Sequence, residues 1–392
     1  MTDTTVKYFH SGMPGAPVLS GTAGSLIAVL DACLVDGFAV TAVASLVVAA
    51  GVATATISGG HSAEVGSVVL VTGATPSPLN GEKKVQSVGS GNTTLTFDAS
   101  GVADQTATGT IALKLAGAGW VKAFFGTNSA AYRSNNVAAT GCYLRVDDTG
   151  TKVARMIGYE SMSGISLGSG LFPTSAQRSG GTYWTKSSAA DASARSWSLA
   201  ADDRGFVLAI AFSLSIPLGG ALVAFGDLIP AKSGDAWSCV LSGYAADKSA
   251  SAPGDTNDFA VLRAAADELF LPRSHTAVGS SVQGFKAFPL IAPGVTTGFA
   301  SGNGPLQYPN APDGGLYFTD LLIFEPFQNC LRGRWPGLYC CPQTLPFALF
   351  QPNARLPAVE NLLGRDLRAM TFGAGSETNA TAFVDTTGPW RG

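Results

Sequence analysis

Short runs of alternating apolar and polar residues dominate the chain, and Gly, Asn, Pro and Asp separate them. A period of two is typical of β-strands that bury one face. Within residues 46–116 the pattern predicts strands at Ser67–Val71, Lys84–Val88, Thr93–Phe97 and Gly109–Leu113. Strands this short and this close in sequence bury enough apolar surface only when their sheet curls. We therefore predict a small β-barrel module over residues 46–116.

One helical pattern lies in the first 45 residues, which we expect to anchor the subunit. Ser25 suits the N-cap position and Gly37 suits the end of a helix. The pattern predicts one short helix over residues 25–36. The apolar residues that share one face of it are Leu26, Val29, Leu30, Cys33 and Leu34.

The remainder of the chain also has the pattern of strands. Residues 117–250 are expected to form a β-rich domain, and residues 259–392 a β-rich region with an extended apolar end. Between them, Ser249–Asp258 is rich in small and polar residues, which predicts an exposed loop or boundary. The fold class expected is mainly β, with a small β-barrel module, one or two larger β-sandwich-like domains and one short N-terminal helix. The clearest further strands are expected at Tyr143–Val146, Val153–Tyr159, Phe206–Leu214, Leu222–Phe225 and Leu316–Glu325.

One uncharged stretch, Phe38–Ile57, has the length of a membrane span. Its composition of Ala, Val, Thr, Ser and Gly instead favours two short strands that turn at Gly51. We therefore expect no membrane span. The first residues, Met1–Pro14, lack the pattern of a secretory signal, so we expect the chain to be made in the cytoplasm.

Charge is sparse, at 13% of the 392 residues, and the chain contains 48 Gly. A soluble domain ordinarily carries about twice that fraction of charged residues. We interpret the deficit as surface that other copies or other proteins cover, which predicts a homo-oligomer or a larger assembly. The net charge of −3 and the absence of basic blocks argue against a nucleic-acid partner.

The predicted barrel resembles a known insert. The segments that carry the resemblance are His61, Val65–Val68, Thr72–Thr75, Leu79–Gly81 and Thr94–Phe97. They are similar to the small β-barrel insert of tailed-bacteriophage virion proteins that is named after the first catalytic cysteine half-domain of ubiquitin-activating enzymes. The resemblance covers roughly residues 50 to 115 and implies no ubiquitin chemistry, because this segment contains no cysteine.

Beyond residue 120 the chain resembles structural proteins of tailed phages. The resemblance implies a virion protein of the tail or of another virion surface, with other virion structural proteins as partners. Within that class we expect a position in the tail, at the tip or baseplate, with host attachment as a further role. A capsid decoration or collar protein is the alternative position. The segments compared are Tyr143–Asp148, Gly158–Met162, Phe225–Leu228, Leu331–Tyr339 and Thr387–Arg391.

Motifs with catalytic or ligand-binding chemistry are few, and we expect no catalytic residues, no cofactor and no metal. Gly164–Gly168 matches GxSxG, but the residues after it do not favour the helix that a nucleophile elbow needs. The pairs Asp147-Asp148 and Asp202-Asp203 are interpreted as turn residues, with a cation site or glycan hydrolysis as the alternative. The other candidates are His10, His61 and His275, which lack metal-ligand spacing. Cys340-Cys341 are expected to be reduced, with a vicinal disulfide or a soft-metal site as the alternatives.

Aromatic and arginine residues near the C-terminus are the candidate partner contacts, because such side chains offer large, rigid contact area. The alternative is an intramolecular corner in which a tryptophan packs under a proline turn. A glycan-binding tail protein would instead need Trp184, Trp197 or Trp237 exposed along a shallow groove. The candidate partner contacts are Arg332, Arg334, Trp335, Tyr339, Trp390 and Arg391.

Overall fold

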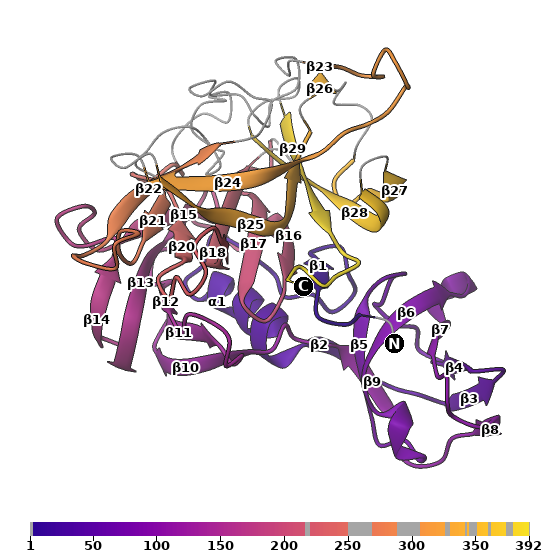
Figure 1. Cartoon of the computed structure of the whole chain (residues 1–392). Coiled ribbons are helices and arrows are strands. Elements are labelled where there is room, and N and C mark those ends of the chain that lie inside the picture. Colours follow the sequence, from indigo (N-terminus) through magenta and orange to yellow (C-terminus); the bar gives the residue numbers. More distant parts are fainter. Residues whose placement is uncertain are drawn as a thin grey trace.

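Strands form nearly all of the regular structure, as the alternating pattern predicts, and one short helix lies near the N-terminus (Figure 1). Of the predicted loop at Ser249–Asp258, all but Ser249 lies outside the described residues. The computed structural model describes residues 3–215, 220–249, 269–287, 306–325, 330–341, 343–344, 351–359, 362–373 and 379–391.

Eight strands form an antiparallel sheet that curls into a half-barrel beside the main body (Figure 1). Their order is β2-β9-β5-β6-β7-β4-β3-β8, so β2 and β8 are edges and the barrel stays open. The prediction of a small curled β module is confirmed. The strands are β2 (Phe38–Ala42), β3 (Ser45–Ala49), β4 (Val52–Thr56), β5 (Val68–Thr72), β6 (Gly81–Val88), β7 (Thr94–Asp98), β8 (Gln105–Thr106) and β9 (Ala112–Leu115).

Two local details of the half-barrel differ from the prediction. The stretch Phe38–Ile57 contains three strands instead of two, and the turn at Gly51 is confirmed. Ala50 and Gly51 have φ values of 49° and 76°, which is the geometry of a tight hairpin. The last strand begins at Ala112 rather than Gly109, because Gly109 has a φ of 108° and packs against the carbonyl of Gly73.

The helix lies where it is expected, but its cap differs. The α-helix α1 (Ser25–Leu30) continues as a π-helix over Asp31–Asp36 and ends at Gly37. Ser25 is wrong as the N-cap: its hydroxyl donates to the carbonyls of Ser20 and Thr22, at 2.8 and 3.0 Å. Gly24 takes the N-cap position, and a distant aspartate supplies the cap described below. Two 3₁₀ turns complete the helical residues, Ser77–Leu79 and Ser90–Asn92.

A six-stranded sheet forms one layer of the body. Its order is β10-β11-β12-β13-β14, and β15 pairs with β13. The predicted strands at Tyr143 and Val153 are both present. The strands are β10 (Trp120–Gly126), β11 (Ser129–Ser134), β12 (Tyr143–Asp147), β13 (Val153–Gly164), β14 (Leu167–Phe172) and β15 (Thr182–Thr185).

A thirteen-stranded sheet forms the other layer, and it joins the N-terminal strand to the C-terminal strands. Two further short strands, β23 (Leu306–Gln307) and β26 (Gln343–Thr344), pair in parallel. The large sheet contains β1 (Lys7–His10), β16 (Ser196–Ala201), β17 (Gly205–Ala211), β18 (Ala221–Asp227), β19 (Ile229–Pro230), β20 (Cys239–Ser242), β21 (Leu269–Leu271), β22 (Val282–Ala287), β24 (Thr319–Glu325), β25 (Cys330–Cys340), β27 (Arg355–Val359), β28 (Leu362–Gly373) and β29 (Asn379–Asp385).

Aromatic side chains join the two sheets into a sandwich. Trp120 of β10 packs its ring on Phe206 of β17 with centroids 5.6 Å apart. Trp184 of β15 meets the same phenylalanine at 6.0 Å, and Phe172 of β14 stacks on Phe225 of β18 at 6.3 Å. These side chains are buried, so the predicted β-sandwich-like body is confirmed.

Candidate interaction site

Three neighbouring strands lie on the side of the half-barrel away from the large sheet (Figure 1). On β3, β4 and β7 the positions of Leu46, Ala53 and Phe97 are buried, so the alternate positions point outward. We call this outward surface the threonine face. It consists of Ser45, Val47, Ala49, Val52, Thr54, Thr56, Thr94, Thr96 and Asp98.

Strand register aligns small hydroxyl and methyl side chains in a row across the threonine face. Val47 pairs with Thr54, and Thr54 pairs with Thr96. The row continues beyond the face on both sides, to Thr106 of β8 and to Ser87 of β6. The hydroxyls of Ser87 and Thr96 are 2.6 Å apart. β-branched residues dominate this row, and they have few rotamers to lose when a partner covers them.

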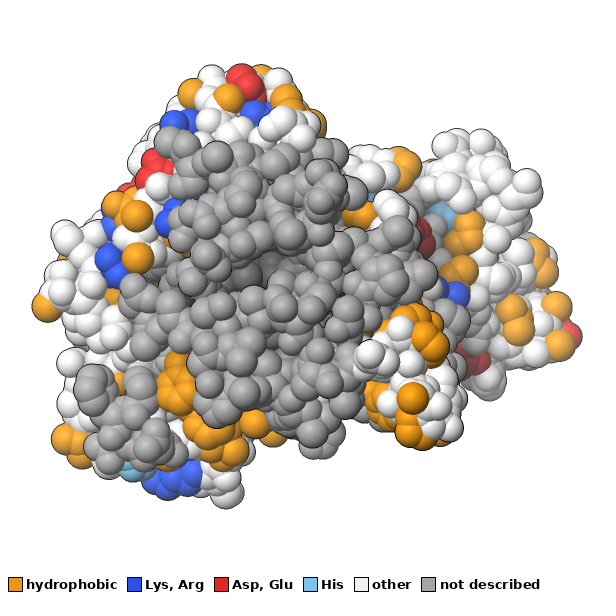
Figure 2. Space-filling model, turned by 90° about the horizontal axis from the view of Figure 1, so that it is seen from above, with side chains coloured by type: hydrophobic (Ala, Val, Ile, Leu, Met, Phe, Trp, Pro, Cys, Tyr) orange, Lys and Arg blue, Asp and Glu red, His pale blue; other side chains and the backbone are white. Residues whose placement is uncertain are grey.

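Charge is nearly absent from the threonine face. Asp98 is its single charged residue, and a hydrogen bond from the Ser100 hydroxyl lowers the pKa of its carboxyl. Val47 and Val52 are 39% and 38% exposed. The half-barrel, on the right of Figure 2, carries few charged side chains on the side seen there. Depletion of charge with exposed apolar groups is typical of the core of a protein interface.

Polar contacts hold the half-barrel against the body, and we call them the seam. Lys7 of β1 forms an ion pair with Glu82 of β6 at 2.9 Å. Lys84 of β6 donates to the carbonyls of Thr386 and Thr387 near the C-terminus, at 2.6 and 2.7 Å. The seam therefore ties the half-barrel to both ends of the chain, which fixes the direction in which the threonine face points.

One carboxylate of the seam contacts two basic side chains. Glu64 lies 2.8 Å from Nε2 of His10 and 2.9 Å from Nη2 of Arg368. The hydrogen bond from His10, helped by the charge of Arg368, lowers the pKa of Glu64. Because these three residues belong to the half-barrel, β1 and β28, their contact joins three separate parts of the sequence.

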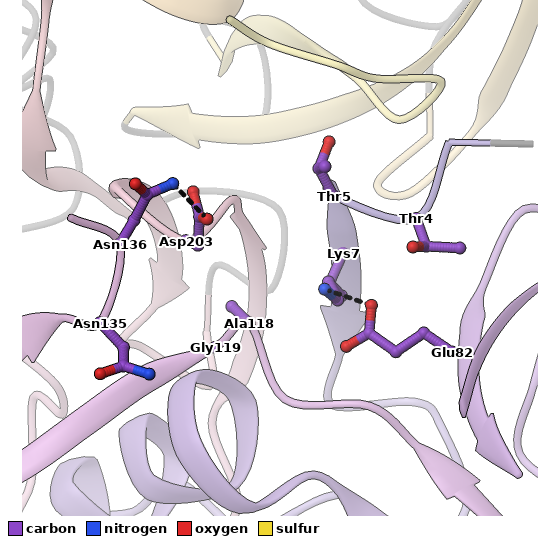
Figure 3. Close-up of a pocket in the computed structure, with 9 residues that line it drawn as sticks. All are labelled: Thr4, Thr5, Lys7, Glu82, Ala118, Gly119, Asn135, Asn136 and Asp203. Carbon is purple, nitrogen blue, oxygen red and sulfur yellow. Dashed lines mark hydrogen bonds and ion pairs between the residues drawn. The ribbon is translucent and has the colours of Figure 1, made fainter. Parts of the chain in front are cut away.

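A pocket of about 360 Å³ opens beside the seam (Figure 3). The Lys7–Glu82 pair lies on one side of it, and on the other Asn136 donates to Asp203 at 2.8 Å. Both carboxylates are thus engaged in contacts within the chain. The lining residues are Thr4, Thr5, Lys7, Glu82, Ala118, Gly119, Asn135, Asn136 and Asp203.

The candidate partner contacts on β25 are divided between interior and surface. Arg332 is 1% exposed and lies 2.9 Å from Asp235 and 3.5 Å from Glu325. Trp335 is also buried, whereas Arg334 is 47% exposed and Tyr339 is half-buried. Contacts within the chain therefore occupy Arg332 and Trp335, and of the four candidates on β25 only Arg334 and Tyr339 reach the surface.

The last candidates form the intramolecular corner that was the alternative interpretation. Trp390 is buried against Gly337, and its indole N–H donates to the carbonyl of Asp385 at 2.8 Å. Arg391 forms an ion pair with Asp202 in the turn between β16 and β17. The C-terminal end thus docks on its own chain. Nothing in the local sequence distinguishes this corner from a contact with another protein.

The GxSxG match lies in a hairpin. Ile165 and Ser166 alone connect β13 to β14, so a strand and not a helix follows Ser166, and the nucleophile-elbow geometry is not present there. Among the described residues, no cluster of His, Cys, Asp or Glu is arranged to hold a metal ion. Cys340 is buried and Cys341 half-buried, and both are thiols.

The aspartate pairs and the remaining histidines have structural partners. Asp202 accepts from the backbone N–H groups of Arg204 and Gly205, as a turn residue does. His61 lies 3.1 Å from the carbonyl of Thr94, and His275 lies 3.3 Å from Glu325. Asp147 accepts a hydrogen bond from Thr149, as a turn residue does. Asp148 is buried, which its interpretation as a turn residue did not predict.

The tryptophans proposed for a glycan groove do not form one. Trp184 and Trp197 are buried, at 0% and 3% exposure, and their indole N–H groups donate to backbone carbonyls. Trp237 is half-buried, and the guanidinium of Arg273 lies over its ring at 4.1 Å. Trp184 and Trp197 are therefore not open to a sugar ring, and a guanidinium covers the ring of Trp237.

No protein-family model matches the chain, and no curated protein matches its sequence. None of the helices in the described part of the chain is long and apolar enough to cross a membrane.

Proposed function

We propose that this chain is a non-enzymatic structural subunit of a tailed-phage virion that acts through contacts with copies of itself and with other virion proteins. The observation that carries the proposal is the threonine face, an exposed sheet surface on which Asp98 alone is charged. An exposed sheet surface with so little charge favours association with other protein surfaces over a monomeric state. The low charge of the whole chain, 13%, supports the same proposal.

The seam supports a structural role for the half-barrel. Ion pairs from Lys7 and Arg368 reach the half-barrel from opposite ends of the chain. A module held at several points keeps one orientation, and a subunit in a regular assembly needs its contact surface in one orientation. The position we favour is the tail tip or baseplate, where the threonine face would meet a neighbouring protein or the host surface.

Sedimentation of the full-length chain tests the contact function. We expect the wild-type protein to form oligomers as its concentration rises, and the variant T54K/T96K to remain monomeric, because two cations on the threonine face would have to be buried. The matched control V137K/V278K adds two cations outside the threonine face, at side chains that are 103% (Val137) and 73% (Val278) exposed. This control should still oligomerise. A wild-type monomer at every concentration, or equal effects of the two variants, would contradict the proposal.

Antibody labelling tests the position. Antibodies raised against the chain should label one end of the tail when particles are viewed by electron microscopy. Label on the head or at the neck would favour the capsid decoration or collar alternative. Particles that carry no label would contradict a virion role altogether.

A further inference from the structure

A lysine and an aspartate contact each other in the interior, and neither has any exposed surface. Asp148 follows β12, and Lys186 follows β15. Nζ of Lys186 contacts Oδ1 of Asp148, and both side chains are 0% exposed. The backbone N–H of Lys186 donates to the carbonyl of Lys152 at 2.9 Å, which holds the end of β15 beside the start of β13.

The partners of this pair match the hydrogen-bonding needs of an amide. Nζ of Lys186 donates to the carbonyl of Thr22 at 2.6 Å. Oδ2 of Asp148 accepts from the backbone N–H groups of Leu26 and Ile27, at 2.8 and 3.3 Å. An ammonium has three donors, and the described residues give it two acceptors. A secondary amide would have one N–H for Thr22 and one carbonyl for the helix N–H groups.

Burial favours the neutral form of both groups. It raises the pKa of Asp148 and lowers the pKa of Lys186, because a charge loses its hydration inside the protein. A buried ion pair recovers only part of that loss. A neutral amine is a nucleophile and a protonated carboxyl is its electrophile, so the environment favours the reactive form of each group.

We propose that Lys186 and Asp148 join in an intramolecular isopeptide bond between Nζ and Cγ. The amine lone pair forms the N–C bond, and the Cγ–Oδ1 bond breaks. Two hydrogens, one from Nζ and one from the carboxyl group, leave with Oδ1 as water. No oxidation state changes, and no co-reactant is needed. The N–H groups of Leu26 and Ile27 stabilise the negative charge that Oδ2 carries in the tetrahedral intermediate.

The bond would join the end of β12 covalently to the end of β15, and its carbonyl would accept the N–H groups of the first turn of α1. It replaces two buried charges with one neutral, fully hydrogen-bonded group. The site is closed to solvent, which opposes hydrolysis of the bond once the water has left. This inference does not rest on the proposed function.

Mass spectrometry of the purified, denatured full-length chain decides the question. We expect a mass about 18 Da below that of the sequence, the loss of one water. Digestion should release one branched peptide that contains both Lys186 and Asp148. A wild-type chain at its full sequence mass would overturn the proposal, and this measurement does not depend on the folding of any variant.

Two lysine variants locate the bond. K186M should regain the full sequence mass, whereas the matched control K152M, changed at a half-buried lysine beside the site, should keep the deficit. A deficit that persists in K186M, or that disappears in K152M while K152M remains folded, would overturn the assignment to Lys186.

Discussion

His10 and Glu64 lie 2.8 Å apart across the boundary between the first strand and the half-barrel. Arg368 reaches the same carboxylate at 2.9 Å from the C-terminal part of the chain. Three parts of the sequence thus meet at one acidic side chain. The attachment of the half-barrel is therefore sensitive to the ionisation of that side chain.

The variant E64Q should show this dependence on pH. The pKa of Glu64 is lowered in the folded chain, chiefly by the hydrogen bond from His10. A lowered pKa stabilises the fold above the unfolded value of about 4.3, and the stabilisation is lost as pH falls through the folded value. At pH 7 we expect E64Q to be less stable by about 0.5–1 kcal/mol, because the pair is partly exposed. Urea unfolding between pH 7 and 3 measures the difference, which should shrink towards pH 3.

The control for this measurement is D36N. The Asp36 side chain is exposed at the end of the π-helix. Its substitution should leave the pH dependence of unfolding as in the wild type. If E64Q and wild type lose stability in parallel as pH falls, the role given to Glu64 is wrong.

The corner under Trp390 makes Gly337 intolerant of a side chain. A Cβ at Gly337 would lie 2.2 Å from Nε1 of Trp390, and the φ of this residue is 67°. We expect G337A to lower the free energy of unfolding by about 2–4 kcal/mol, since both steric overlap and backbone strain contribute. Chemical denaturation gives the value.

The variant G314A serves as the control that separates the steric contribution from the backbone contribution to the loss in G337A. The φ of Gly314 is 71°, close to that of Gly337, and nothing lies within 4 Å of a Cβ built there. G314A should therefore cost only about 1 kcal/mol, the backbone component. Equal losses in the two variants would show that Trp390 does not press on Gly337.

Two neighbouring arginines on β25 should differ strongly when each is changed to methionine. R332M would leave Asp235 and Glu325 buried without their cation, and we expect a loss of about 3–5 kcal/mol. R334M removes a 47% exposed side chain that lies 3.4 Å from Asp320, and we expect less than about 1 kcal/mol. Thermal unfolding of both variants checks the contrast, and similar stabilities would refute the burial assigned to Arg332.

Local pattern was sufficient to predict the mainly β class, the helix and a minority of the individual strands. Thr93–Phe97 alternates in sequence and forms β7 at Thr94–Asp98, because one face of it packs into the half-barrel. The helix over residues 25–36 follows from apolar spacing, and its end follows from Gly37. These features depend on neighbours in sequence, which is why composition and spacing reveal them.

Long-range contacts were beyond the reach of the same pattern. Asp148 has the sequence of a turn residue, yet it accepts hydrogen bonds from a helix more than a hundred residues earlier. Arg332 and Trp335 have the composition of an exposed contact, yet they are buried. The threonines of the threonine face are visible in the sequence, but only strand pairing places Thr54 beside Thr96.

The pairing of β1 limits the order in which parts of the chain can fold during synthesis. Lys7–His10 is made first, but its partner strand spans Ser198–Ala201. The N-terminal strand must therefore wait, unpaired, while nearly two hundred further residues emerge. All strands of the half-barrel lie between Phe38 and Leu115, so this module can close early and sequester its own apolar residues. The half-barrel can therefore fold first, and the body packs against it once the later strands have been made.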